Sequence, residues 1–496
     1  MFSWSYRHLD AVTARGFRRL SLHPGPDLDL YAAAAVVGVP LEEARHAVDL
    51  LVRAHMIQPA GPDRYGLHDL LRGYARELAT TGDAGDERRS ALTRLFDHYL
   101  HAAATAMDTL YPSERHRRPR IPVPASPVPP LDSPAAARAW LDAERANLVA
   151  TAAYTTDRGW PDHAIRLAAT VFRYLEFAGH YPEVVTISAH VRRAARDRGD
   201  LAAEARALSD LAVIDLRQSR YQQAETDLRQ ALGLYLQAGD RTGQARVLGN
   251  LGITSFQQGH YREADDRHEQ ALAQYRQVGD RFGEARTLNN LGLLDLRMGR
   301  YDRASDRLRQ AAALSRQTGD WAITAQSLVN LAVVDLRQGR YEQAVTNLGE
   351  AQVVNRQTSN AAITASGLVC LGLIDVRQGR PGQAASRLRR ALRLSRESGD
   401  RCGEAEALNG LGEVLLATGQ AECAGARYRA ALDLATAIGD KYEQARARCG
   451  LAGSHHAAGE PGPAHREWQQ ALALFSALGT PEADDVRACL ASAAQC

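Results

Sequence analysis

The sequence predicts an all-α solenoid of 40-residue helical hairpins that follows a small module of another kind. Two sets of positions support this prediction. In each set one residue type returns every 40 residues, seven times in succession. Alanine occupies positions 205, 245, 285, 325, 365, 405 and 445, and leucine occupies positions 211, 251, 291, 331, 371, 411 and 451. Apolar residues inside each unit are spaced by three or four, which is the period of an amphipathic helix. One hairpin cannot bury its apolar face alone, so we expect the units to stack.

Residues 1–80 lie outside this register and predict three short helices followed by a hairpin. The helices are expected from Leu9 to Leu22, from Leu28 to Val37 and from Leu41 to His55. A Gly-Pro-Asp turn at residues 61–63 separates two short runs that are predicted as strands. Three helices and a hairpin are typical of a winged helix.

A winged helix that binds DNA needs a basic third helix, and the third helix here is not basic. Glu42, Glu43 and Asp49 outweigh Arg45 and Arg53 in this segment, so it would repel the phosphate backbone. We therefore expect no nucleic-acid binding by this chain alone. Transcription regulation through DNA binding by this module is kept as the alternative function.

Three segments connect the module to the repeats: a connecting helix over 81–110, a proline-rich linker over 111–133 and a helical adaptor over 134–160. The linker contains prolines at 112, 119, 122, 124, 127, 129 and 130 and arginines at 115, 117, 118 and 120. We interpret it as extended, basic and solvated, and contact with an acidic surface is the alternative. Ser133 and Pro134 provide the cap and the first-turn proline of the next helix.

Glycines divide each repeat into two helices. Gly259 ends the first helix of one unit, and glycine returns at 299, 339, 379, 419 and 459, because it tolerates the left-handed conformation of a helix C-terminus. A Gly-Asp pair such as 239–240 ends the second helix, and its aspartate can cap the next one. We expect eight repeats over 161–480, of which the first is degenerate, and a capping helix over 481–496.

The repeat resembles the tetratricopeptide repeat. Leu251-Gly252, Ala264, His268 and Ala271 match in spacing the Leu-Gly, alanine, large apolar and alanine positions of that family. The unit is 40 residues long here against 34 in the usual family member, with longer helices, as in kinesin light chain-like repeats. The resemblance covers residues 161–480 and implies a right-handed superhelix whose concave groove binds other proteins.

In that family one face of each first helix lines the groove, and here this face is rich in arginine and asparagine. The candidate groove residues are Arg206, Arg246, Asn250, Arg286, Asn290, Arg297, Asn330, Arg337 and Arg377. Asp210, Glu406 and Glu413 oppose them at equivalent positions. We interpret the groove as a site for an extended, acidic segment of a protein. Nucleic acid is a less suitable partner, because Phe256 is one of few aromatic residues on this face.

Each part of this interpretation has a structural alternative. The arginines can be a solvated face that forms weak ion pairs with aspartates such as Asp295 and Asp335. Asn250, Asn290 and Asn330 form a ladder with one amide per repeat, which suits a peptide backbone. Alternatively, each of these asparagines bonds a neighbouring helix.

A second resemblance covers nearly the whole chain. Its motifs are Phe-Ser-Trp-Ser-Tyr at 2–6, Leu-Ser-Leu-His-Pro-Gly-Pro at 20–26, Leu-His-Asp-Leu-Leu-Arg at 67–72, Trp-Leu at 140–141 and Glu-Arg-Ala-Asn-Leu at 144–148. They look like the winged-helix end of the NB-ARC (STAND) nucleotide switch in actinobacterial AfsR-type (SARP) transcriptional regulators, which also continues into tetratricopeptide repeats. In those regulators a DNA-binding domain and a P-loop ATPase come first. The resemblance implies that this chain is similar to their carboxyl-terminal, sensor-like part.

The resemblance also implies a role for His68. In that family the histidine of a Met-His-Asp motif contacts the phosphates of bound ADP, and His68 takes that position, with Leu67 in place of the methionine. The one lysine of this chain, Lys441, follows Asp440 rather than the last glycine of a P-loop. His68 therefore has a nucleotide to contact only if another chain supplies one. The alternative is a histidine that bonds locally, and we expect no cofactor.

Composition and motifs favour an interaction protein over an enzyme. The chain has 60 Lys+Arg and 58 Asp+Glu, so its overall charge favours neither nucleic acid nor an acidic membrane. It contains no GxSxG, HExxH or GxGxxG motif, and its six cysteines show no metal-ligand spacing and are expected as reduced thiols. With no leader-like start and no long apolar run, we expect a cytoplasmic protein without a membrane partner.

Our leading hypothesis is a non-enzymatic scaffold or sensor of a bacterial regulatory system that binds a protein segment in its groove. DNA-binding regulation through the amino-terminal module is the alternative. A third possibility is that the chain is a fragment of a larger nucleotide-switched regulator.

Overall fold

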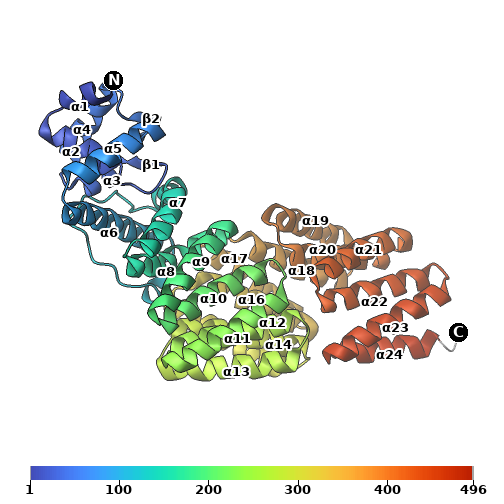
Figure 1. The fold of residues 1–496 in the computed structure, drawn as a ribbon. Coiled ribbons are helices and arrows are strands. Elements are labelled where there is room, and N and C mark those ends of the chain that lie inside the picture. The colour runs from blue at the N-terminus through green and yellow to red at the C-terminus, as the bar shows by residue number, and fades with distance from the viewer. Residues whose placement is uncertain (1, 494–496) are drawn as a thin grey trace. The chain divides into compact units, whose positions relative to one another are not determined.

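The computed structural model describes residues 2–493 and divides into two compact units, which meet in the sequence between Ile214 and Asp215. Helices dominate both units (Figure 1).

The first unit begins with four helices and a small sheet. The helices are α1 (Phe2–Arg7), α2 (Ala11–Leu20), α3 (Leu30–Val37) and α4 (Leu41–Arg53). The strands β1 (Asp27–Asp29), β2 (Gln58–Gly61) and β3 (Arg64–Gly66) form an antiparallel sheet in the order β1-β3-β2. The expected hairpin is therefore present, with its turn where the Gly-Pro-Asp sequence predicts it.

Strand β1 was not predicted, and it changes the start of the next helix. Asp27 lies opposite Gly66 in the sheet, so the chain is extended where the sequence predicts the first residues of a helix from Leu28. Helix α3 instead begins at Leu30, after the Asp29 side chain accepts a hydrogen bond from the Ala32 amide. Sheet pairing and this N-cap together outweigh the helical pattern of the sequence.

Longer helices complete the first unit. They are α5 (Asp69–Gly82), α6 (Gly85–Leu110), the 3₁₀ helix η1 (Pro112–Arg117) and α7 (Pro134–Asp157). The Ser133 hydroxyl caps α7 by accepting from the Ala136 amide at 3.2 Å, which is the helix start that the sequence predicts.

The proline-rich linker is packed against α6, so the prediction of a solvated linker is wrong at several positions. Leu131 is buried, and its carbonyl accepts a hydrogen bond of 2.9 Å from the Thr109 hydroxyl. Arg115 and Arg118 pair with Asp108 at 2.9 and 2.7 Å. The burial of Leu131 and the ion pairs with Asp108 hold the segment against α6, whereas Val123 and Val128 between the prolines stay exposed.

Consecutive helix pairs form the remainder of the described chain. Their bounds are α8 (Pro161–Phe177), α9 (Tyr181–Arg198), α10 (Leu201–Arg217), α11 (Tyr221–Ala238), α12 (Arg241–Gln257), α13 (Tyr261–Val278), α14 (Arg281–Arg297), α15 (Tyr301–Thr318), α16 (Trp321–Arg337), α17 (Tyr341–Asn355), α18 (Ala361–Arg377), α19 (Pro381–Ser398), α20 (Arg401–Ala417), α21 (Ala421–Ile438), α22 (Lys441–Ala457) and α23 (Pro461–Leu478). A final helix, α24 (Glu482–Ala493), follows. Residues 494–496, the end of the expected capping helix, and with them Cys496, lie outside the described residues.

The helix ends are formed by the residues that the repeat predicts. Gly239 ends α11 with a left-handed φ of 67°, and the Asp240 side chain then accepts a hydrogen bond of 2.9 Å from the Gly243 amide at the start of α12. Asp280, Asp320, Asp400 and Asp440 cap later first helices in the same way. Each cap satisfies a backbone amide that has no partner within its helix.

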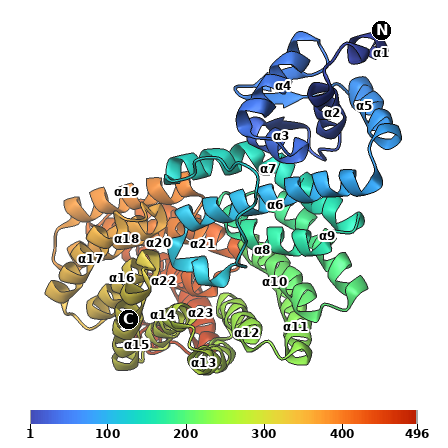
Figure 2. The same cartoon turned by 90° about the vertical axis from the view of Figure 1, so that its left-hand side faces the viewer.

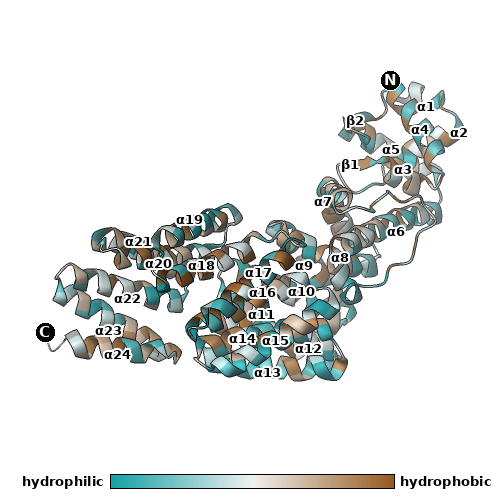
Figure 3. Cartoon of the chain, turned by 180° about the vertical axis from the view of Figure 1, so that it is seen from behind, coloured by the Kyte–Doolittle hydropathy of each residue, from teal (hydrophilic) through white to brown (hydrophobic). Residues whose placement is uncertain are grey.

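Glycine within the first helices makes room for a large side chain on the second helix. A Cβ atom on Gly292 would lie 2.6 Å from Cγ of Leu308, which is closer than atoms can pack. Gly372 has the same relation to Leu388, and Gly412 has it to Tyr428. The large residues therefore fill space inside the hairpin as well as between hairpins. In Figure 3 the outer helix α13 is mostly hydrophilic, whereas the first helix α16 carries more apolar residues.

The end of the second unit packs against its beginning. Tyr261 of α13 and Leu294 of α14 share one apolar cluster with Tyr442 of α22 and with Phe475 and Leu478 of α23. Figure 2 shows α22 and α23 behind α12 and α14. We call this set of interactions the closing contact. It brings repeats that are far apart in the sequence to one place.

Candidate binding groove

A cavity of about 510 Å³ lies within the second unit, where the first helices of five consecutive repeats face one another. These helices are α14, α16, α18, α20 and α22, which are the elements that the repeat predicts for a groove. The volume falls in the range of small-ligand sites, ~300–1,000 Å³.

One wall of the cavity is apolar. It is made by Leu293 and Leu296 of α14, by Val329 and Val333 of α16, and by Leu373 of α18. Val329 is buried, whereas Val333 and Leu373 are half-buried and face the open volume. An apolar group bound here would remove both its own surface and the surface of this wall from water, which favours binding.

A second wall of the cavity is charged and belongs to the closing contact. The Arg297 guanidinium lies 3.8 Å from the centre of the Tyr442 ring. The Tyr442 hydroxyl accepts a hydrogen bond of 2.8 Å from Arg337 and donates one of 2.6 Å to Glu482. Tyr442 thus joins two arginines of the early repeats to the last helix by a cation–π contact and two hydrogen bonds.

Three acidic residues balance the arginines of this wall. Arg446 forms ion pairs of 2.9 Å with Glu413 and 3.0 Å with Glu443. Arg297 lies 3.6 Å from Glu406 and 3.8 Å from Glu443. The cations on this wall are therefore largely neutralised by the protein itself.

The half-buried carboxyl group of Glu406 and the buried one of Glu443 have opposite pKa shifts. Burial, together with the neighbouring charge of Glu443, raises the pKa of Glu406 to about 7. The pKa of Glu443 is lowered, because the attraction of Arg446 and Arg297 and a hydrogen bond from Asn409 outweigh its burial. Glu406 is thus the group of this cavity that changes its charge near neutral pH.

Four of the nine candidate groove residues line this cavity: Arg297, Asn330, Arg337 and Arg377. Within residues 2–493, Arg377 is exposed and has no ion-pair or hydrogen-bond partner for its side chain. Arg297 and Arg337 are instead held by the closing contact. The three arginines occupy equivalent positions in successive repeats, but only Arg377 keeps its guanidinium available.

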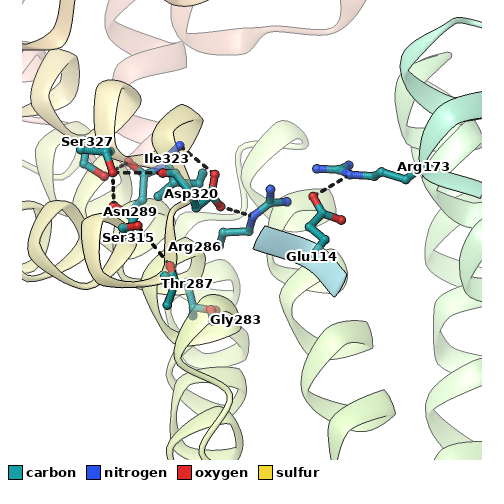
Figure 4. A network of polar contacts seen from close by, with 12 residues as sticks. Glu114, Arg173, Gly283, Arg286, Thr287, Asn289, Ser315, Asp320, Ile323 and Ser327 are labelled. Atoms are coloured by element: carbon teal, nitrogen blue, oxygen red, sulfur yellow. Dashed lines mark hydrogen bonds and ion pairs between the residues drawn. The ribbon is translucent and has the colours of Figure 1, made fainter. Parts of the chain in front are cut away.

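The other candidate arginines lie outside the cavity and have protein partners. Arg206, in the first unit, lies 3.9 Å from Asp210. Arg246 donates a hydrogen bond of 2.7 Å to the Tyr235 hydroxyl. Arg286 pairs with Asp320 at 3.0 Å, as Figure 4 shows.

The asparagines do not form a uniform ladder. Asn330 is buried, and its amide donates to Asn289 at 3.1 Å while its carbonyl accepts from Gln326 at 3.1 Å. The Ser327 hydroxyl also donates to Asn289, across neighbouring first helices (Figure 4). Asn330 therefore bonds a neighbouring helix. Asn250 and Asn290 are half-buried, and neither lines the cavity.

His68 lies in the first unit, at the start of α5. Its side chain is exposed, and Nδ1 accepts a hydrogen bond of 3.4 Å from the Leu70 amide. The structure thus gives His68 a helix-capping contact.

Other residues of the same motifs meet at a polar junction within the first unit. Arg72 donates hydrogen bonds to the carbonyls of Gly25 and Pro26, both at 2.9 Å. His23 bonds the Tyr99 hydroxyl at 2.8 Å, and burial lowers the pKa of His23 to about 3, which keeps it neutral. These contacts tie the loop of the amino-terminal module to α6.

A buried ion pair completes this junction. Arg64 of β3 bonds both Asp27 of β1 and Glu144 of α7, and Glu144 is fully buried. Glu144 also accepts a hydrogen bond of 2.6 Å from Asn147. The motifs that resemble the regulators therefore hold the module, α6 and α7 together. A second ion pair of the first unit joins Arg173 and Glu114 at 3.0 Å (Figure 4).

Sequence reasoning missed Tyr442, Glu443 and Arg446. The repeat pattern places them on the first helix α22, but it does not show that α22 lies beside α14. A signal was present, because an aromatic residue and an adjacent glutamate follow the cap Asp440 where the preceding repeat has Cys402 and Gly403.

The match to a family model decides where this chain belongs. The model of the tetratricopeptide repeat matches residues 203–277, 256–317, 283–357, 323–397 and 403–477, which together make up more than half of the 496 residues. The chain belongs to the tetratricopeptide repeat family. Its repeat is the helical hairpin that the sequence predicts, and the helices stack in the consecutive pairs expected of such a solenoid.

Two curated relatives carry the name regulatory protein AfsR. The protein from Streptomyces griseus is 34% identical over 236 residues, and that from Streptomyces coelicolor is 32% identical over 237 residues. Each match covers 47% of this chain and 24% of the relative. The chain thus aligns with about a quarter of the length of these relatives.

A solved structure has a similar fold. It is a signal transduction ATPase with numerous domains (STAND) from Pyrococcus horikoshii with a tetratricopeptide repeat sensor. The TM-score is 0.59 at 14% identity, over 96% of this chain and 64% of that one. This likeness supports the same arrangement of elements.

The described residues offer no metal site and no membrane span. No group of three or more His, Cys, Asp and Glu side chains within residues 2–493 is placed to hold a metal ion. No helix in the same residues is both long and apolar enough to cross a membrane. The five cysteines that are described are free thiols.

Proposed function

We propose that this chain is a non-enzymatic scaffold or sensor of a bacterial regulatory system and that it binds a protein segment in its repeat groove. One observation carries the proposal: the first helices of five consecutive repeats form a single cavity with an apolar wall and an available arginine. Membership of the tetratricopeptide repeat family and the likeness to regulatory protein AfsR support a regulatory interaction role.

We further propose that residues 1–80 are a winged-helix module that serves as a structural joint. The support is its junction with α6 and α7, in which Arg64 and Arg72 are used for internal contacts. The exposed side of α4 carries Glu42, Glu43 and Asp49, and this charge disfavours DNA binding by the module. A gel shift with genomic fragments tests this: a sequence-specific complex would contradict it.

Affinity capture from a bacterial lysate tests the groove. The intact chain is compared with Val333→Glu, which places a charge on the apolar wall of the cavity, and with Val353→Glu as the matched control. Val353 is 58% exposed on the second helix α17 and does not line the cavity. Captured proteins are identified by mass spectrometry, purified and titrated against each variant.

The proposal predicts that Val333→Glu loses the partner while Val353→Glu retains it. A partner that binds both variants with equal affinity would contradict groove binding. Circular dichroism of both variants checks that the fold is kept, because Val333 is half-buried. Val353 is exposed, and a substitution there should change stability by about 0.5 kcal/mol or less.

A further inference from the structure

The charges of the cavity leave one cation without a protein partner. Four arginines line the cavity, and three of them face acidic side chains: Arg297 with Glu406 and Glu443, Arg337 with Glu482, and Arg446 with Glu413. In the described part of the chain Arg377 has no such partner. A guanidinium that ends in an open cavity can bind an anion by two parallel hydrogen bonds.

The apolar wall lies on the same helices as this arginine. Leu373 is one helical turn before Arg377 on α18, so both side chains point to the same face of that helix. Val333 stands one turn before Arg337 on the neighbouring helix α16. An occupant that satisfies both features has an apolar body joined to one anionic group.

The anion is expected to be singly charged. Glu406 and Glu413 also line the cavity and would repel a second negative charge. With Arg297, Arg337 and Arg446 already paired, one guanidinium remains, and it matches one carboxylate.

We propose that this cavity binds an apolar group joined to a carboxylate, with the apolar group against α16 and α18 and the carboxylate at Arg377. The inference rests on the proposed function, because it names the chemistry of the occupant of that groove. The carboxylate has two possible sources: the end or an acidic residue of a protein segment, or a free organic acid.

Calorimetric titration of the full chain distinguishes these sources with four probes. The peptide acetyl-Leu-Ala-Leu is used with a free carboxyl terminus and with an amidated one. Decanoate is used beside decyltrimethylammonium, both below their micellar concentrations. The two peptides differ only in the charge of the carboxyl terminus, and the two amphiphiles have alkyl chains of nearly equal length and opposite charges. The expected result is that the peptide acid binds more tightly than the amidated peptide and that decanoate binds more tightly than decyltrimethylammonium.

Two substitutions assign the contacts. Arg377→Gln is expected to weaken the carboxylate probes about tenfold, which corresponds to one charge-assisted hydrogen bond, and to leave the amidated peptide unchanged. Arg389→Gln is the matched control, because Arg389 is exposed on the second helix α19 and does not line the cavity. Leu373→Gln is expected to weaken every probe that binds.

Each outcome has a defined meaning. If the peptide acid binds more tightly than decanoate, the source is a protein segment, and if decanoate binds more tightly, it is a free organic acid; both results keep the inference. If the amidated peptide binds as tightly as the acid, or if Arg377→Gln changes nothing, the carboxylate requirement is overturned. If no probe binds although a partner is captured in a Val333-dependent manner, the inference fails while the proposed function stands.

Discussion

The polar junction of the first unit and the cavity of the second unit use arginine in opposite ways. At the junction, Arg64 and Arg72 bond carboxylates and carbonyls of the protein, and Glu144 of α7, which pairs with Arg64, is fully buried. In the cavity, Arg377 is exposed beside half-buried apolar residues and has no such partner in the described chain. Satisfied polar groups indicate a structural joint, whereas unmatched ones indicate a surface that a ligand completes.

The largest loss of stability is expected when the polar junction of the first unit is broken. Glu144→Ala removes one of the two carboxylates that pair with Arg64 and also the acceptor of the buried Asn147 amide. It should destabilise the first unit by about 3–5 kcal/mol, the usual cost of breaking a buried ion pair by removing one partner. Chemical unfolding with a probe in that unit measures this. A loss below about 1 kcal/mol would show that the junction is not structural.

The second-largest loss of stability is expected when the closing contact is broken. Tyr442→Ala removes a nearly buried ring together with its cation–π contact and two hydrogen bonds, at a cost of about 3 kcal/mol. Hydrogen exchange should accelerate in α14 and α22 and stay unchanged in α2 to α4. Unaltered exchange in α14 would contradict the closing contact.

The cavity should bind acidic ligands with a pH dependence of its own. Because the pKa of Glu406 is about 7, this group is mostly neutral at pH 6 and mostly ionised at pH 8. The groups around it are Glu443, Asp440, Arg297 and Arg446, and ionised Glu406 adds repulsion toward an acid. Titrations of the free peptide acid should therefore be about threefold tighter at pH 6 than at pH 8.

Glu406→Gln provides the control for that pH dependence. This variant should bind the peptide acid with nearly equal affinity at both pH values, because the titrating group is gone. If the variant keeps the full difference between pH 6 and pH 8, another group is responsible and the assignment to Glu406 is wrong.

The smallest effect is expected on stability at the available arginine. Arg377→Gln should change the free energy of unfolding by less than about 0.5 kcal/mol, since the exposed side chain has no ion pair to lose. Thermal unfolding measures it beside Asn330→Ala, which breaks a buried hydrogen-bond network and should cost about 1–3 kcal/mol. If Arg377→Gln and Asn330→Ala lower the free energy of unfolding equally, Arg377 is as structural as Asn330, and the comparison fails.

The repeat could be predicted from the sequence because it depends on local physics. Glycine at the end of a helix and aspartate at the start of the next act within one turn, so Gly239 and Asp240 marked their boundary without tertiary information. Strand β1 could not be predicted, because Asp27 is extended only through its pairing with Gly66. The packed linker was missed for the same reason, since Leu131 is buried by α6.

The candidate site could be predicted in part. Periodicity placed Arg297, Arg337 and Arg377 on one face, and all three line the cavity. It could not show that Tyr442 contacts Arg297 and Arg337, because these contacts join repeats that are far apart in the chain. It also could not separate Asn330, held by Asn289, from Asn250. Such differences arise from the superhelix and not from the repeat.

Site-specific photo-crosslinking tests the central claim most directly. A benzophenone amino acid is placed at Val333 inside the cavity, or at Val353 on the outer helix α17 as the control, and each full chain is irradiated in its native bacterial lysate. Groove binding predicts that one partner protein is cross-linked from position 333 and not from position 353. Cross-linking of that partner from position 353 alone would contradict the account.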